Sequence, residues 1–131
     1  MAGIDEYGGA GGAMDQPWSE GSPIYRQLRE RVVAMILEGV LKEGDPLPSV
    51  RNVAAEYRIN PLTVLKAYQS LADEQLVEKQ RGRGMFVRTG ARAALLADER
   101  QRFIRDQWPK VRATIERLGF SAEDLLKEPR K

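Results

Sequence analysis

The residues of this sequence best suited to chemistry are arginines flanked by glycines. The run Gln80-Arg81-Gly82-Arg83-Gly84 joins two short segments, Leu76–Lys79 and Met85–Arg88, in which apolar and polar residues alternate. The pattern predicts two strands joined by a basic hairpin tip. Glycine lets the backbone approach a partner closely, and guanidinium groups on such a tip fit the narrow, negatively charged minor groove of DNA. A glycine-rich turn with solvated arginines is the alternative interpretation.

A second group of polar residues lies on one face of a helix predicted to begin at Asn60-Pro61. Helical spacing places four residues on its inner face: Val64, Ala67, Tyr68 and Leu71. The outer face carries Leu62, Thr63, Lys66, Gln69 and Ser70, with no acidic residue before Asp73. Because phosphates repel carboxylates, an acid-free face is typical of a helix that enters a DNA groove.

Two earlier helices are predicted to position this face. The first of them is predicted to begin at Ser22-Pro23, with the serine as its N-cap and the proline at its first helical position. It is predicted to end at Gly39 in a left-handed conformation, with the apolar Val40 closing that end. Ser49 is the predicted cap of a short second helix that carries Arg51 in its first turn, opposite the apolar face. Helix, helix, tight turn, helix and hairpin follow in the order of a winged helix-turn-helix. We therefore expect a mainly α fold with a small β-hairpin wing.

The composition excludes several classes of protein. The 131 residues include no cysteine and no histidine, which rules out Cys/His zinc sites, disulfide frameworks, cysteine nucleophiles and Ser-His-Asp triads. The arginine-rich tip lacks the spacing of a phosphate-binding P-loop, and no paired carboxylates or nucleophile–base pair are evident. We expect no enzyme activity, no catalytic residue, no metal and no cofactor. No apolar run approaches the ~20 residues that span a bilayer, and no secretory signal is evident, so we expect a cytoplasmic protein.

Charge and composition divide the chain into three predicted regions. Residues 1–21 contain acidic but no basic residues and a glycine-rich run, which predicts a flexible leader in which Trp18 packs loosely. All 21 basic residues and 15 of the 19 acidic ones follow, which gives the remainder a net charge of +6. That balance is compatible with nucleic-acid binding. We expect the DNA-binding domain over residues 22–89 and a helical tail over residues 90–131.

The tail carries large apolar residues at nearly helical spacing: Leu96, Phe103, Ile104, Trp108, Val111, Ile115 and Leu118. Pro109 predicts a kink or a helix boundary after Trp108. The helix is predicted to end at Gly119, with Phe120 as the apolar residue that closes it. Ser121 is the predicted cap of a last short helix. A segment this short can bury these residues either against the DNA-binding domain, here called the head, or against a second copy of the chain. We favour pairing, because DNA-binding heads usually work as two-fold dimers.

Residues Pro23–Val87 resemble the GntR family of bacterial transcription regulators. The resemblance is carried, in order and spacing, by PIYRQL at Pro23–Leu28, GDPLPSVR at Gly44–Arg51, NPLTVLKAY at Asn60–Tyr68 and RGRGMFV at Arg81–Val87. The short helical tail is similar to that of the YtrA-like branch, because larger branches carry there a ligand-binding or aminotransferase-like domain. The resemblance implies a homodimeric regulator, most often a repressor, on a palindromic double-stranded operator, often of its own operon with a transporter.

The same resemblance implies roles for individual residues. Arg51 would meet a phosphate or a guanine edge in the major groove. The groove-facing part of the third helix would be Asn60, Leu62, Thr63 and Lys66. The wing residues Arg81, Gly82 and Arg83 would enter the minor groove. The sequence leaves open whether a small-molecule effector exists.

Three positions depart from the family pattern. Leu65 stands where several relatives have a base-reading arginine, and Leu62 stands where an asparagine is common. Gln75 replaces a glycine that often ends the third helix. Because leucine offers no hydrogen bond to a base, Lys66 becomes the expected basic contact of this helix. A winged helix used as a protein-interaction module is the alternative function.

Overall fold

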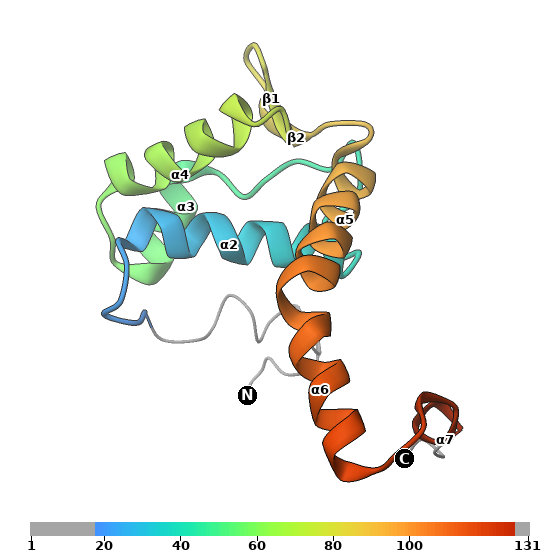
Figure 1. Cartoon of the computed structure of the whole chain (residues 1–131). Helices are drawn as coiled ribbons and strands as arrows, with labels where there is room; N and C mark the ends of the chain where they lie inside the picture. The colour runs from blue at the N-terminus through green and yellow to red at the C-terminus, as the bar shows by residue number, and fades with distance from the viewer. Residues whose placement is uncertain (1–17, 128–131) are drawn as a thin grey trace. The chain divides into compact units, whose positions relative to one another are not determined.

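The computed structural model describes residues 18–127, so most of the predicted leader lies outside the described residues. The chain forms two compact units, one ending at Leu95 and the other beginning at Leu96. The first unit contains α2 (Ile24–Leu37), α3 (Val50–Tyr57), α4 (Pro61–Asp73), β1 (Val77–Gln80) and β2 (Gly84–Val87), followed by the start of α5 (Ala91–Arg102). Figure 1 shows the β1–β2 hairpin beyond the C-terminal end of α4. The mainly α fold with a small hairpin is confirmed.

The core of the first unit lies where α4 packs against α2 and α3. The fully buried side chains include Leu28 and Ile36 of α2 and Val64 and Leu71 of α4. Each such aliphatic side chain contributes about 2 kcal/mol when it leaves water. Tyr68 of α4 is also buried, and its hydroxyl donates a hydrogen bond of 2.7 Å to the Pro48 carbonyl. Burial raises the pKa of this phenol, so it stays a neutral donor that ties α4 to the segment before α3.

The helix starts of the first unit follow the predicted caps in two cases of three. The Ser49 hydroxyl accepts from the Asn52 N–H at 3.0 Å, and the Asn60 side chain accepts from the Leu62 N–H at 2.8 Å. The predicted cap at Ser22 is wrong, because Pro23 itself occupies the cap position of α2 and no side chain caps it. Ser22 instead offers its carbonyl to the Gln27 side-chain amide.

The end of α2 is confirmed at Gly39, which has a φ of +85°. The Val40 N–H donates to Met35 O and the Gly39 N–H to Ile36 O, which is the paired bonding of a Schellman motif. Val40 does not close this end as predicted, because its side chain is 40% exposed, whereas Leu41 is buried in the core.

A third extended segment, not predicted as a strand, supports the wing. Antiparallel pairing matches Val77 with Val87 and Gln80 with Gly84. On the other side of β2, the Leu47 N–H donates to Met85 O and the Val87 N–H donates to Asp45 O. The segment before α3 therefore holds the wing strand directly, which fixes the hairpin to the helix-turn-helix.

Trp18 makes specific contacts, contrary to the prediction of loose packing. Its ring lies 3.9 Å from the Arg31 guanidinium carbon and edge-on to Tyr57, with ring centroids 6.2 Å apart. Beside it, Ser19 and Gln27 exchange two hydrogen bonds of 2.8 Å, one through each main-chain polar group of Ser19. These interactions attach the chain preceding α2 to the outer sides of α2 and α3.

The second unit continues α5 through a π-helical turn, η2 (Phe103–Gln107), into α6 (Trp108–Leu118) and α7 (Ala122–Leu126). The predicted boundary near Pro109 falls one residue earlier, at the start of α6. Gly119 adopts φ +82°, and Ser121 caps α7 by accepting from the Asp124 N–H at 3.0 Å, both as predicted. Within residues 18–127, none of the helices is long and apolar enough to cross a membrane.

The end of α4 generates a stability prediction. Gln75 has a left-handed φ of +64°, and it and Leu76 donate to the last-turn carbonyls of Ala72 and Leu71. A side chain in this region is strained, so Gln75→Gly is expected to raise the free energy of unfolding by about 0.5–1 kcal/mol. Urea denaturation measures it. Asp73→Gly, within α4, should lower stability instead, and equal effects of the two would contradict the interpretation.

Candidate nucleic-acid interface

The outer face of α4 is the centre of the candidate interface. Leu62 is 69% exposed, Leu65 is 49% exposed and Lys66 is exposed, whereas Thr63 is half-buried. The first acidic side chain of the helix is Asp73, in the last turn, and it accepts a hydrogen bond of 3.2 Å from Gln69. The face is therefore acid-free over its first three turns, and its exposed surface is more apolar than that of a typical solvated helix.

The N-terminal end of α4 brings together two further predicted site residues. Asn60 Oδ1 is occupied by the capping bond to the Leu62 N–H, which leaves its amide group as the part available to a ligand. Arg51 is exposed on α3 and lines a shallow groove that continues to Pro61 at the start of α4. The groove is otherwise lined by small and aliphatic side chains: Val50, Ala54, Ala55 and Ile59.

The wing holds its two arginines differently. Arg83 folds back, with its Nη1 donating to Gln80 Oε1 at 2.8 Å and its guanidinium carbon 5.0 Å from the centre of the Phe86 ring. Arg81 is exposed on the turn. Gly82 between them has φ +73°, where a side chain would be strained. The tip therefore presents one exposed cation, Arg81, and one cation, Arg83, that is held against the Phe86 ring.

The eight predicted DNA-contact residues do not form a single cluster. Arg51 and Asn60 lie at the N-terminal end of α4, while Arg81, Gly82 and Arg83 lie on the hairpin that Figure 1 shows beyond its C-terminal end. Thirteen helical residues separate these ends by about 20 Å. The arrangement suits two successive contact regions on a long ligand.

Two residues that the sequence reasoning missed extend the interface onto the start of α2. The Lys66 ammonium lies 4.2 Å from the centre of the Tyr25 ring, a cation–π contact between α4 and α2. Arg26 Nη2 lies 3.5 Å from the Tyr25 hydroxyl, and this guanidinium lowers the pKa of the phenol, with a smaller effect from Lys66. The signal was present in PIYRQL, where an aromatic residue and an arginine begin a helix.

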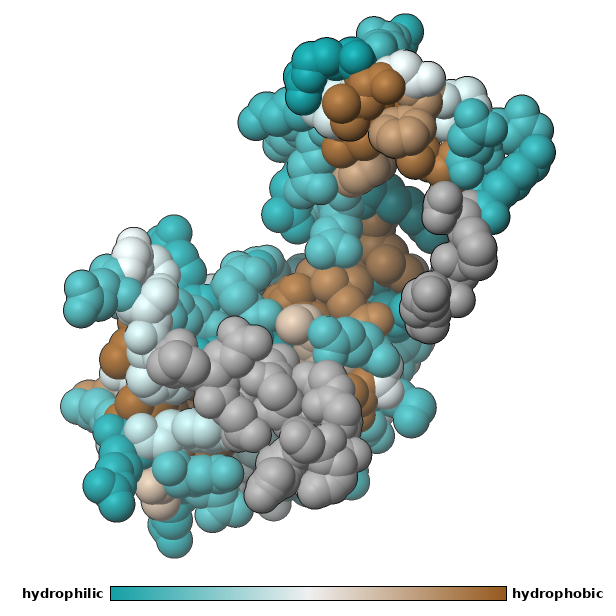
Figure 2. Space-filling view, turned by 90° about the horizontal axis from the view of Figure 1, so that it is seen from below, coloured by the Kyte–Doolittle hydropathy of each residue, from teal (hydrophilic) through white to brown (hydrophobic). Residues whose placement is uncertain are grey.

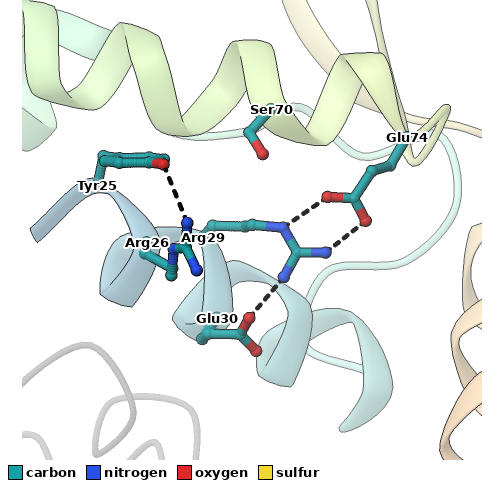
Figure 3. A pocket seen from close by; sticks show the side chains of 6 residues that line it. All are labelled: Tyr25, Arg26, Arg29, Glu30, Ser70 and Glu74. Atoms are coloured by element: carbon teal, nitrogen blue, oxygen red, sulfur yellow. Dashed lines mark hydrogen bonds and ion pairs between the residues drawn. The ribbon is translucent and has the colours of Figure 1, made fainter. Parts of the chain in front are cut away.

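The pocket beside Tyr25 and Arg26 is occupied by an ion pair that joins α2 to the end of α4. Its other lining residues are Arg29, Glu30, Ser70 and Glu74. Figure 3 shows Arg29 of α2 directed at Glu74 at the end of α4, and a second bond joining it to Glu30. Arg29 Nε donates to Glu74 Oε2 at 2.7 Å and Nη2 donates to the other carboxylate oxygen, so the pair is bidentate. The Glu74 carboxylate raises the pKa of Arg29. Because these donors are occupied by carboxylates, the pocket is poorly suited to an anionic ligand.

The predicted dimerisation residues all lie in the second unit, and the first of them, Leu96, is the residue with which the unit begins. Leu96, Trp108 and Ile115 are half-buried, and the others are exposed: Phe103, Ile104, Val111 and Leu118. Among the described residues of this unit, from Leu96 to Lys127, none is buried. Figure 2 shows apolar surface gathered on this C-terminal part, bordered by hydrophilic residues. The helices of this unit thus leave several large apolar side chains exposed to solvent, and a group of exposed apolar side chains often marks an interaction site.

Comparisons with known proteins agree with this geometry. Residues 24–87 match the model of the bacterial regulatory proteins of the gntR family. The chain is 35% identical over 104 residues to the HTH-type transcriptional repressor YtrA of Bacillus subtilis, which covers 79% of each chain. A transcriptional regulator from Oenococcus oeni superposes with a TM-score of 0.63 at 31% identity, covering 86% of this chain and 92% of that one. The DNA-binding domain of AraR, solved in complex with operator ORX1, superposes with a TM-score of 0.50 at 26% identity, covering 56% and 89%.

The Tyr25–Lys66 contact generates a prediction for nucleic-acid binding. Tyr25→Phe keeps the aromatic face under the ammonium, whereas Tyr25→Leu removes it and releases the flexible lysine. We expect the leucine variant to bind duplex DNA about threefold more weakly, which corresponds to a cation–π contribution of about 0.6 kcal/mol, and the phenylalanine variant to stay closer to wild type. Fluorescence anisotropy with a labelled duplex measures both. Equal losses would assign the role to the hydroxyl instead of the ring.

Proposed function

Because the chain belongs to the GntR family of bacterial regulatory proteins, we propose that it represses transcription as a homodimer bound to a palindromic operator. The observation that carries the proposal is the acid-free outer face of α4, flanked by Arg51 at one end and by the wing arginines at the other. That the relative YtrA is named a repressor supports the direction of the regulation.

The two contact regions suit two neighbouring grooves of the duplex. The face formed by Asn60, Leu62, Thr63 and Lys66 would enter the major groove, which is wide enough to admit a helix. Arg81 would extend into the adjacent minor groove, while Arg83, held by Gln80 and Phe86, would stabilise the hairpin and meet a phosphate. Arg51 and Arg26 would contact the backbone on either side of α4. This division assigns most of the affinity to phosphates and the minor groove.

The apolar stripe of the C-terminal helices supports the homodimer. In α6 the residues Trp108, Val111, Ile115 and Leu118 recur at intervals of three and four, which is the spacing of a helix-pairing face. A second copy is the occupant that matches a self-complementary stripe, because an isologous interface uses the same patch twice. Pairing would place the two recognition helices about 34–36 Å apart along one side of the DNA.

We propose that the operator lies upstream of the operon that contains the protein's own gene. Its sequence would have the inverted symmetry of the dimer. A transporter is the candidate product of that operon. An inverted repeat in that intergenic DNA, protected by the protein in footprinting, tests this placement. For a small-molecule effector, the proposed binding place is the seam between the two copies of the chain. Regulation by protein level alone is the other arrangement consistent with the sequence.

The phosphate contacts generate a prediction about salt. Arg81→Ala and Lys66→Ala should each weaken binding to all duplexes and reduce the slope of log affinity against log salt by about one. Titrations at several salt concentrations measure the slope. Arg112→Ala removes the same charge from α6, where the guanidinium pairs with Glu116 at 3.1 Å, and should leave the slope unchanged. A fall in affinity with an unaltered slope would refute the proposed phosphate roles.

The dimer generates a second prediction. Replacing Phe103 and Ile104 with aspartate puts charge on the apolar stripe, so the variant should sediment as a monomer and lose most of its operator affinity. Ala113→Asp places an aspartate on the opposite side of α6 and should leave a dimer. A Phe103/Ile104 variant that stayed dimeric would contradict pairing through these helices. A dimer that bound no duplex would favour the protein-interaction module.

A further inference from the structure

Two leucines occupy the part of α4 where a hydrogen-bonding reader is expected. Leu62 and Leu65 are three residues apart, so they lie on the same side of the helix, and 69% and 49% of their surfaces are exposed. In the described part of the first unit, the exposed large apolar side chains are these two and Val40. Val40 follows the end of α2, so the leucine pair is the apolar patch of the outer face.

The neighbours of this patch determine what it would contact. Lys66 is adjacent, held by Tyr25, and the groove from Pro61 to Arg51 borders the start of the helix. No acidic side chain of α4 precedes Asp73. An occupant must therefore be strongly anionic and also offer small apolar groups at close spacing. The major groove of DNA meets both conditions, because phosphates line it and each thymine presents a C5-methyl group there.

We propose that Leu62 and Leu65 form an apolar reader that selects thymine methyl groups in the major groove. The inference rests on the proposed function, since it concerns the DNA sequence that the same face prefers. Leucine rejects cytosine at such a position, because cytosine lacks the methyl group and the amino N–H that is not paired with guanine would be buried without a partner. The preferred half-site then carries thymines opposite the first two turns of α4, and its discrimination comes from contact with methyl groups.

The test replaces thymine with deoxyuridine, which removes the methyl group and leaves the hydrogen-bonding edge unchanged. A duplex is first selected from a randomised library by the full-length wild-type protein. Each thymine of the selected half-site is then replaced singly, and affinity is measured by anisotropy. At the thymines read by the pair, deoxyuridine should weaken wild-type binding about fourfold, the equivalent of one buried methyl group. Leu62→Ala and Leu65→Ala should each lose this difference at the thymine that the leucine contacts.

The controls separate this inference from the proposed function. Val40→Ala shortens an exposed apolar side chain away from α4 and should keep the full thymine preference. Because Leu62 and Leu65 are exposed, their alanine variants should retain the wild-type melting temperature and salt slope. Equal wild-type affinity for the thymine and deoxyuridine duplexes would overturn the reader while leaving the regulator intact, as would alanine variants that keep the preference. A wild-type protein that retained no duplex in the selection would overturn the proposed function itself.

Discussion

The packing of α4 against α2 is the constraint on which the rest of the head depends. Its buried side supplies Val64, Tyr68 and Leu71, which are at most 2% exposed, and the Tyr68 hydroxyl fixes the helix to the segment that precedes α3. At the end of the helix the bidentate Arg29–Glu74 pair adds a polar contact between the same two helices. Once the inner side is committed in this way, the outer side is presented in one orientation.

That orientation separates two kinds of recognition on one surface. Cations surround the two exposed leucines of α4, on the wing, at the start of α2 and on α4 itself, and two of them are pre-positioned by aromatic rings: Lys66 by Tyr25 and Arg83 by Phe86. The centre is apolar. Charge at the borders supplies affinity that salt weakens, whereas apolar contact at the centre depends on the shape and methyl pattern of the groove. The two contributions are physically independent, so substitutions should affect one without the other.

The π turn decides how the tail presents its apolar residues. In a regular α-helix, residues five apart lie about 140° apart around the axis. Phe103 and Trp108 nevertheless face each other, with ring centroids 6.4 Å apart, because the Trp108 N–H bonds to Phe103 O across the wider turn. Pro109 gives a reason for the turn, since its ring would crowd the Arg105 carbonyl of a regular helix. A helical wheel with a uniform 3.6 residues per turn would therefore place the apolar residues before and after this turn on different sides of the helix.

The pattern of residues was enough to predict the order of the elements, the inner side of α4, the caps at Ser49, Asn60 and Gly39, and the hairpin with its basic tip. These features depend on side-chain caps, backbone freedom and the period of apolar residues. All three involve residues that are near one another in the sequence, so they can be predicted from it. Contacts of the folded chain were needed to show that Thr63 is half-buried, that Tyr25 supports Lys66, that Gly44–Leu47 pairs with the wing, and that the Ser22 side chain does not cap α2. Each of these depends on a contact between segments distant along the chain or on competition between neighbouring donors and acceptors. Periodicity gives the direction of a side chain, but the partner that meets it is set by how the helices pack.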